Sequence, residues 1–193
     1  MSQPKYPESV KLISSIFSNN KNFLNTSIEE LSNQLGLIDY ISEFMSFDYT
    51  DYYEKEMGIS LVRRFISFEN LVRPESLPDV KHITDKIEKG LSREGKRQVN
   101  IDPGYLSQAH LILATGKGYT HRPYLRDGIY ADLTLIYRDN TFQSLDWTYP
   151  DYSGKEITGM LSTIRKKYII QLRRLKKDDS SQLEQNIYKK RGG

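Results

Sequence analysis

Apolar and polar residues repeat along the chain with two different periods, and both periods occur within its first fifty residues. Residues 10–18, VKLISSIFS, are rich in β-forming residues and precede the polar stretch NNKN, so they predict a strand and a turn. The segment that follows carries apolar residues at helical spacing, and Gly36 can end that helix. The helical positions are Phe23, Ile28, Leu31 and Leu35.

Two further strands are predicted at residues 38–47 and 59–71, separated by an aromatic and acidic loop. The second of them contains the consecutive arginines Arg63 and Arg64, whose side chains must point to opposite faces of a sheet. A buried guanidinium is costly unless it is paired. We therefore expect one of the two arginines to form a structural ion pair or to contact a ligand.

A second helix and a short strand are predicted next. Apolar residues recur at helical spacing over residues 80–91, behind a cap at Asp79. Residues 96–106 predict a strand that is broken by a turn at residues 102–104, DPG, because proline fixes φ and glycine accepts a positive φ.

The C-terminal half is expected to add strands and one long helix. Residues 110–114, HLILA, are apolar on both faces and predict a central strand. Residues 128–147 predict a hairpin that turns at Asp139 and Asn140. A stripe of apolar residues then predicts an amphipathic helix over residues 155–177.

The predicted order of elements indicates a fold class. Strand-helix-strand occurs twice and is followed by antiparallel strands and a closing helix, which is typical of an α+β protein. We expect a ferredoxin-like, split β-α-β core extended by antiparallel strands and a long C-terminal helix. A chain of 193 residues is expected to form one domain, over residues 1–175, and the polar residues 176–193 predict a flexible tail.

Composition limits the class of protein. No run approaches the roughly 18–20 apolar residues of a membrane span, and residues 1–18 lack the pattern of an export signal. We therefore expect a cytoplasmic protein with no membrane partner. The absence of cysteine excludes disulfides, thiol catalysis and thiolate zinc sites, and the presence of only three histidines argues against an all-histidine metal site.

The distribution of charge matters more than its total. A net charge of +3 is too small to argue for nucleic acid by itself. Residues 165–177, RKKYIIQLRRLKK, however, carry seven basic residues and no acid. This segment is either a solvated helix face or a contact for RNA or an acidic partner.

The stretch ATGKGYTHR, residues 114–122, is the strongest candidate for a site. It does not match the Walker motif of phosphate-binding loops, because a glycine follows Lys117 where that motif needs Ser or Thr. Its chemistry still suits an anion: Lys117 offers a point charge, Arg122 a bidentate fork and His121 a proton near neutral pH. The alternative is an exposed basic hairpin.

Carboxylates that could complete such a site come from other segments. Asp51 and Glu56 lie in the acidic loop, Asp102 lies at the predicted turn, and Asp132 lies on the polar face of a strand whose other face is apolar. Beside basic groups they could hold a divalent metal such as magnesium with a phosphorylated ligand, or act as general acids and bases. They could equally form an ion-pair network, and the turn itself is a sufficient explanation for Asp102.

Several stretches, in order, resemble the uncharacterised prokaryotic family catalogued as domain of unknown function 4416. They are DYTDYYEKEMG, SLVRRFISFENL, RQVNIDPGYL, LILATGKGYTHRPYL, GIYADLTLIY and WTYPDY, and the resemblance covers roughly residues 10–172. It implies no activity. The residues that match the pattern of the family are Tyr52, Tyr53, Glu56, Arg64, Asp102, Gly104, Lys117, His121, Arg122, Trp147 and Asp151. This chain departs from the pattern at Gly118 and Pro123, where an acidic and an aliphatic residue are expected.

Two functions remain in competition at this stage. The first is the binding of a phosphorylated or otherwise anionic small molecule such as a nucleotide, with hydrolysis or phosphoryl transfer left open. Its candidate catalytic residues are His121, Asp102 and Glu56, and its candidate ligand-binding residues are Lys117, Arg122, Arg64, Tyr53 and Asp132. The second is an RNA- or protein-binding module that uses the basic C-terminal helix and the tyrosine clusters.

Overall fold

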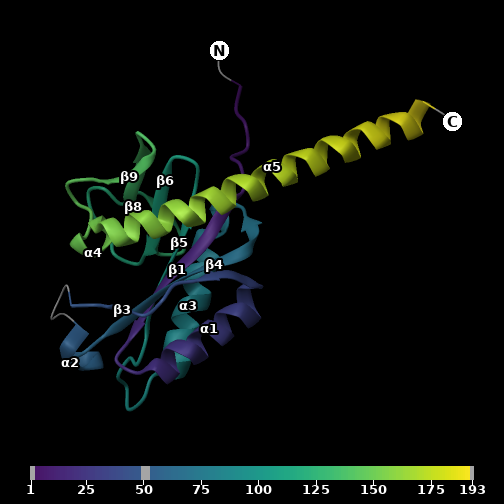
Figure 1. Cartoon of the computed structure of the whole chain (residues 1–193). Coiled ribbons are helices and arrows are strands. Elements are labelled where there is room, and N and C mark those ends of the chain that lie inside the picture. The colour runs from purple at the N-terminus through teal and green to yellow at the C-terminus, as the bar shows by residue number, and fades with distance from the viewer. Residues whose placement is uncertain (1–2, 49–52, 192–193) are drawn as a thin grey trace.

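An antiparallel sheet forms the centre of the molecule (Figure 1). The computed structural model describes residues 3–48 and 53–191, and within this part of the chain nine strands join in one sheet. Their order is β2-β4-β1-β5-β6-β8-β7, with β3 paired to β4 and β9 paired to β8. The strands are β1 (Val10–Ser18), β2 (Ile38–Ile41), β3 (Met45–Ser46), β4 (Val62–Val72), β5 (Asn100–Leu106), β6 (His110–Thr115), β7 (Tyr124–Arg126), β8 (Ile129–Arg138) and β9 (Thr141–Ser144).

Helices cover the two faces of the sheet (Figure 1). Two helices of similar length, α1 (Lys21–Leu35) and α3 (Leu77–Leu91), lie on one face, and the long α5 (Lys155–Arg191) crosses the other. The remaining helical segments are short: α2 (Glu54–Met57), the 3-10 turn η2 (Pro74–Ser76) and α4 (Pro150–Ser153). The predicted α+β class, with a large antiparallel sheet and a long C-terminal helix, is confirmed.

Each face of the sheet carries its own apolar core. Burying one Leu, Ile or Phe side chain contributes about 1.5–3 kcal/mol, so these two layers supply most of the driving force for folding. The core under α1 and α3 contains Leu12, Ile16, Leu24, Leu31, Ile66, Phe68, Val80, Ile87, Val99 and Ile101. The core under α5 contains Ile13, Phe65, Leu106, Leu111, Leu113, Leu135, Phe142, Tyr152, Ile157, Leu161, Ile164, Tyr168 and Leu172.

Two predicted boundaries were wrong for local reasons. Residues 38–47 form two short strands rather than one. Both pair with β4, and between them the side chain of Ser42 accepts the backbone N–H of Phe65 and so interrupts the ladder with β4. The helix expected behind an Asp79 cap begins at Leu77 instead, with Pro78 in its first turn, where a missing N–H costs nothing.

The predicted turn at residues 102–104 was also wrong, because β5 runs straight through it. The first half of β5 pairs with β1 only, and on its open side the Ile101 N–H donates to Glu88 Oε1 at 2.6 Å. Pro103 lies two residues further along the strand, so its backbone nitrogen points to the same open side. The lack of an N–H there breaks no hydrogen bond between strands. Gly104 serves close approach rather than a turn, since a Cβ there would lie 2.4 Å from the carbonyl oxygen of Ile112.

A bulge in β8 changes which of its side chains share a face of the sheet, so residues two apart on either side of the bulge do not point the same way. Leu111 pairs with Leu135 while Ile112 pairs with Leu133, so Thr134 is an extra residue. Leu135 therefore packs in the core under α5, whereas Leu133 packs on the opposite face. On the polar face of this strand, Asp132 and Thr134 are buried.

A charged contact fastens α5 to the sheet. The fully buried Lys11 on β1 donates to Asp39 Oδ2 at 2.5 Å and to Gln171 Oε1 at 2.7 Å.

The helix α5 continues past the predicted end at residue 177 to Arg191. The domain boundary at residue 175 and the flexibility of the tail remain predictions. Across the described residues, no helix combines the length and the apolar character that crossing a bilayer requires.

Candidate functional site

The loop after β6 carries the predicted site residues Lys117, His121 and Arg122, and it lies beside Asp132 of β8. Arg122 donates from Nε to Asp132 Oδ2 on β8 at 2.8 Å, from Nη1 to the carbonyl oxygen of Lys117 at 3.3 Å and from Nη2 to the hydroxyl of Tyr149 at 3.1 Å. The side chains of Arg122 and Asp132 are each only 9% exposed. The basic loop and one of the proposed carboxylates therefore do meet.

His121 occupies the space between this ion pair and a set of aromatic rings. Its Nε2 lies 3.7 Å from Asp132 Oδ1, is buried and forms no hydrogen bond within the described part of the chain. The imidazole stacks on Trp147, with ring centroids 5.0 Å apart and planes 13° apart, and meets Tyr119 edge-on at 5.4 Å. A histidine held in this way faces both a carboxylate and an aromatic surface.

The bulge in β8 positions that aromatic surface. The indole Nε1 of Trp147 donates to the carbonyl oxygen of Leu133 at 2.8 Å, and Thr148 Oγ1 donates to that of Thr134 at 2.6 Å. Trp147 is nevertheless 40% exposed, and Tyr119 and Tyr149 are more exposed still. We call this region the His121 patch, which consists of Lys117, Tyr119, His121, Arg122, Asp132, Trp147 and Tyr149.

Residue choice in the loop follows from packing as well as from charge. A Cβ on Gly118 would lie 3.1 Å from the ring of Tyr130, so a larger side chain would press on that ring. The acid that the resemblance predicts at residue 118 would require the ring of Tyr130 to shift by a few tenths of an ångström. The prediction did not include Trp147 and Tyr149 as ligand-binding residues, although the aromatic cluster WTYPDY was the signal for them.

Three other predicted site residues lie in a different cluster, on the open side of β5. Glu56 pairs with Arg97 at 2.8 Å, the guanidinium of Arg97 lies 5.4 Å from the ring of Tyr53, and Asp102 accepts a hydrogen bond from Asn100 at 2.8 Å. Asp51 and Tyr52 lie outside the described residues. We call this group the Glu88 cluster, which consists of Tyr53, Glu56, Lys81, Glu88, Arg97, Asn100 and Asp102.

Glu88 of α3 lies at the centre of that cluster. Burial raises the pKa of its carboxyl group to about 7, against the opposing effects of Lys81, of the Ile101 N–H and of Arg97. The nearest guanidinium nitrogen of Arg97 is 3.8 Å away, so charge pairing compensates only part of the lost hydration. Sequence reasoning missed Glu88 and Arg97, because neither has a local pattern that separates it from surface charges.

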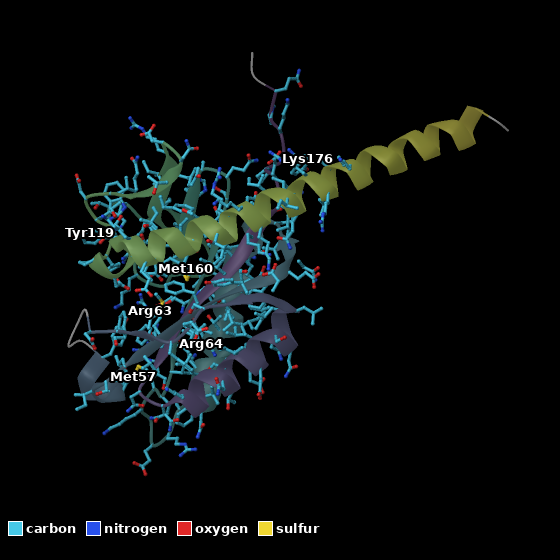
Figure 2. The ribbon with its side chains drawn as sticks, in the orientation of Figure 1. Met57, Arg63, Arg64, Tyr119, Met160 and Lys176 are labelled. Atoms are coloured by element: carbon cyan, nitrogen blue, oxygen red, sulfur yellow. The ribbon has the colours of Figure 1, made fainter. Side chains whose placement is uncertain are left out.

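The consecutive arginines do point to opposite faces, as predicted, and Figure 2 labels both. Arg64 donates from Nε to the carbonyl oxygen of Ser42 at 2.8 Å and lies over the ring of Phe44, away from both clusters. Arg63 is the buried member, and its Nη2 pairs with Asp151 Oδ2 at 2.5 Å. The expectation of one paired, buried arginine is therefore confirmed for Arg63.

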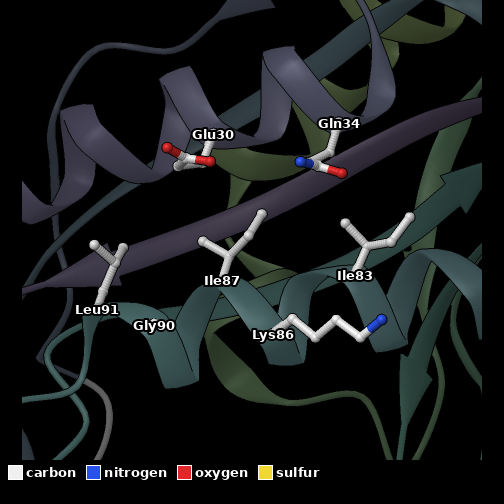
Figure 3. Close-up of a pocket in the computed structure, with 7 residues that line it drawn as sticks. All are labelled: Glu30, Gln34, Ile83, Lys86, Ile87, Gly90 and Leu91. Carbon is white, nitrogen blue, oxygen red and sulfur yellow. The ribbon is translucent and has the colours of Figure 1, made fainter.

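Among the described residues, cavities also occur away from the His121 patch, and two of them are of small-molecule size. One, of about 390 Å³, is a groove between α1 and α3 that Figure 3 shows, and none of the predicted site residues lines it. The other, of about 420 Å³, lies where β3 and β4 meet the junction of α4 and α5. We call it the Arg63 cavity, which is lined by Phe44, Met45, Ser46, Asp48, Arg63, Asp151, Gly154, Glu156 and Ile157.

The residues that the structure describes contain no group of three or more His, Asp or Glu side chains that could hold a metal ion. Searches of curated proteins and of solved structures gave no significant match. A family model described as a domain of unknown function (DUF4416) matches residues 8–168, which is most of the 193-residue chain. The chain therefore belongs to the DUF4416 family.

Proposed function

We propose that this domain binds a phosphorylated or otherwise anionic small molecule at the His121 patch, and that the ligand carries a planar ring, as a nucleotide does. One observation carries the proposal: the basic loop lies beside the exposed rings of Trp147 and Tyr149, and Trp147 stacks on the mostly buried His121. Base-sized rings stack on aromatic side chains at about 1–3 kcal/mol per base. Lysine and arginine supply the charge that a phosphate needs.

The basic groups differ in how they can serve a ligand. Three of the five N–H donors of Arg122 are engaged, so its main effect on a phosphate is through charge and the remaining donors. Lys117 is exposed on the loop and can reach a phosphate as a point charge. Asp132 balances Arg122 and keeps its guanidinium in place.

A catalytic role, hydrolysis or phosphoryl transfer, belongs to the same proposal. What supports it is the pair formed by His121 Nε2 and Asp132 Oδ1 at 3.7 Å, since a carboxylate can orient a histidine that moves a proton. Asp102 and Glu56 lie in the Glu88 cluster, so in this proposal His121 and Asp132 carry the proton chemistry. In this proposal, magnesium would bind together with the phosphate of the ligand.

The proposal extends to the topology of the sheet and to the location of the protein. The strand order β2-β4-β1-β5, with α1 between β1 and β2 and α3 between β4 and β5, supports a ferredoxin-like, split β-α-β core. A cytoplasmic location is proposed from the lack of cysteine in the sequence.

Trp147 provides a direct test, because it is the sole tryptophan of the chain. Nucleotides, nucleosides, sugar phosphates and inorganic phosphate are titrated with and without magnesium, and both Trp147 fluorescence and the thermal midpoint are followed. Nucleotides should quench the fluorescence and raise the midpoint. If no compound changes either signal, with or without magnesium, the proposal is wrong.

Variants separate the two halves of the ligand. Lys117→Gln should weaken nucleotide binding about tenfold, measured by calorimetry, whereas Lys166→Gln, an exposed lysine on α5, should leave it unchanged. Trp147→Leu should abolish the preference for nucleotides over sugar phosphates. Equal losses in Lys117→Gln and Lys166→Gln would mean that only general charge attracts the ligand.

A second function, RNA binding, is favoured by the projection of α5 beyond the sheet (Figure 1). Three of the seven basic residues in the segment 165–177 contact the body of the protein, since Arg165 binds Gln108, Lys167 binds Asp39 and Lys176 binds Glu8. Neutralising the exposed Arg173 and Arg174 should weaken salt-dependent RNA binding. RNA binding that ignores both substitutions would exclude this role.

A further inference from the structure

The two exposed rings of the His121 patch, Trp147 and Tyr149, are held in different ways. Trp147 is fixed directly to β8, because its indole donates to the carbonyl oxygen of Leu133. Within the described residues, the side chain of Tyr149 has one hydrogen-bond partner, Arg122, which is itself a member of the patch. The position of Tyr149 relative to the sheet therefore depends on the chain that follows it.

The chain that follows Tyr149 is the short helix α4. The carbonyl oxygen of Tyr149 accepts the backbone N–H of Tyr152 at 2.9 Å and so begins this helix. Tyr152 is buried and meets the ring of Phe65 on β4 edge-on, with ring centroids 5.9 Å apart. Asp151 is buried as well and accepts from Arg63 Nη2 on β4 at 2.5 Å. Two consecutive residues of α4 are thus fastened to β4.

The ion pair of Arg63 and Asp151 is a rigid anchor. Their side chains are only 4% and 10% exposed, and the ring of Phe47 covers the guanidinium with its centroid 4.1 Å away. Separating the two charges would leave each of them buried without its counterion, so the pair stays closed. Two residues of chain span at most about 7 Å, so the position of Asp151 limits that of Tyr149.

The anchor and the phosphate-binding groups belong to different parts of the sheet. The strands β1, β5 and β6 separate β4 from β8, and residues 147–151 bridge this distance. Lys117 and Arg122 lie on the β8 side, where Arg122 pairs with Asp132 and contacts the carbonyl oxygen of Lys117. A change at the anchor should therefore affect the ring of Tyr149 and spare the contacts to a phosphate.

We propose that Arg63 and Asp151 are positioning residues of the ligand site. Their ion pair holds α4 so that the ring of Tyr149 lies beside the basic loop, where it contacts the planar ring of the ligand. The pair thereby contributes to the preference for nucleotides over sugar phosphates, although neither residue touches the ligand. This inference rests on the function proposed for the His121 patch and names a part of its specificity.

Asp151→Asn tests the anchor in the full chain, because it removes the charge and keeps the shape. Adenosine monophosphate and ribose 5-phosphate are titrated by calorimetry. The affinity for adenosine monophosphate should fall about tenfold, which is the contribution of one stacked ring, while that for ribose 5-phosphate should not fall. Asp146→Asn removes an equal charge from an exposed residue of the same loop and should change neither affinity. An equal loss for both compounds in Asp151→Asn, or no loss for either, would overturn the inference.

A double variant separates positioning from general damage. Tyr149→Leu should cause the same selective loss, and adding Asp151→Asn to it should cost no further affinity, because Asp151 acts through Tyr149. Additive losses would contradict this pathway. If Asp151→Asn does not fold, Arg63→Lys takes its place, since it keeps a cation beside Asp151 and should show a smaller loss with the same selectivity.

The ligand-free protein supplies a separate test. Displacing Tyr149 removes the acceptor of Arg122 Nη2, so the side-chain NMR signals of Arg122 should shift in Asp151→Asn and stay unchanged in Asp146→Asn. Signals that do not shift in Asp151→Asn would reject the anchor. If the signals shift as expected but the unmodified chain binds neither compound, the proposed function is wrong and the anchor of Tyr149 stands.

Discussion

The His121 patch and the Glu88 cluster contain the same kinds of side chain, yet they treat a carboxylate differently. In the His121 patch Asp132 contacts Arg122 at 2.8 Å, so the two buried charges compensate each other directly. In the Glu88 cluster the nearest guanidinium nitrogen lies 3.8 Å from Glu88, and burial raises the pKa of its carboxyl group to about 7. At Glu88 the loss of hydration on burial therefore outweighs the nearby opposite charges, whereas Arg122 and Asp132 lie in direct contact.

Breaking the compensated pair should have the largest effect. Asp132→Asn leaves Arg122 nearly buried without an anion, and we expect a loss of about 3 kcal/mol in the free energy of unfolding. Urea denaturation measures it. Asp139→Asn, at an exposed hairpin position, is the control and should change stability by less than about 0.5 kcal/mol. A similarly small change for Asp132→Asn would show that Arg122 does not depend on it.

The Glu88 cluster should make the free energy of unfolding depend on pH. The folded protein keeps a proton on Glu88 up to a pKa of about 7, whereas the unfolded chain releases it near pH 4.5. The unfolded state therefore binds fewer protons in this window, and stability should fall as pH rises from about 4.5 to 7, by about 3 kcal/mol at most. Urea titrations across this range measure the slope.

Glu88→Gln should flatten this dependence, because an amide of the same shape has no proton to lose and can still accept from the Ile101 N–H. Glu29→Gln, at an exposed position on α1, is the matched control and should leave the slope unchanged. A slope that survives Glu88→Gln would assign the titration to another group.

Removing the cation beside Glu88 should raise the pKa of this carboxyl group. Arg97 lowers the pKa of Glu88, so Arg97→Gln should move the midpoint of the pH dependence to a higher value. The accompanying loss of stability should be only about 1 kcal/mol, because the side chain of Arg97 is partly exposed. An unchanged midpoint would mean that this charge is screened from Glu88.

The smallest effect is expected for Glu56→Gln. This substitution breaks an exposed ion pair with Arg97, which is worth about 0–1 kcal/mol. The pH dependence assigned to Glu88 should remain. A loss of several kcal/mol would show that the Glu56 pair holds the cluster together.

The part of the fold that local pattern encodes was predictable. The strand at residues 10–18, the helix that ends before Gly36 and the hairpin at Asp139 and Asn140 occur where apolar period and turn chemistry indicated them. The hairpin shows why, since both of its turn residues adopt the positive φ that Asp and Asn tolerate. The prediction of a turn at residues 102–104 was wrong. A proline is tolerated inside β5 because its missing N–H lies on the side of the strand that has no partner, and no local sequence pattern reveals which side that is.

The candidate site divides in the same way. By itself, the sequence determined which groups are chemically able to act: a basic loop with Lys117, His121 and Arg122, and carboxylates elsewhere. Which of them meet depends on strand pairing, because Asp132 lies beside the loop through the pairing of β6 with β8, whereas Asp102 and Glu56 lie with Arg97 and Glu88. The physical reason is that residue type and spacing act over a few residues, while burial and charge pairing depend on segments far apart in the chain.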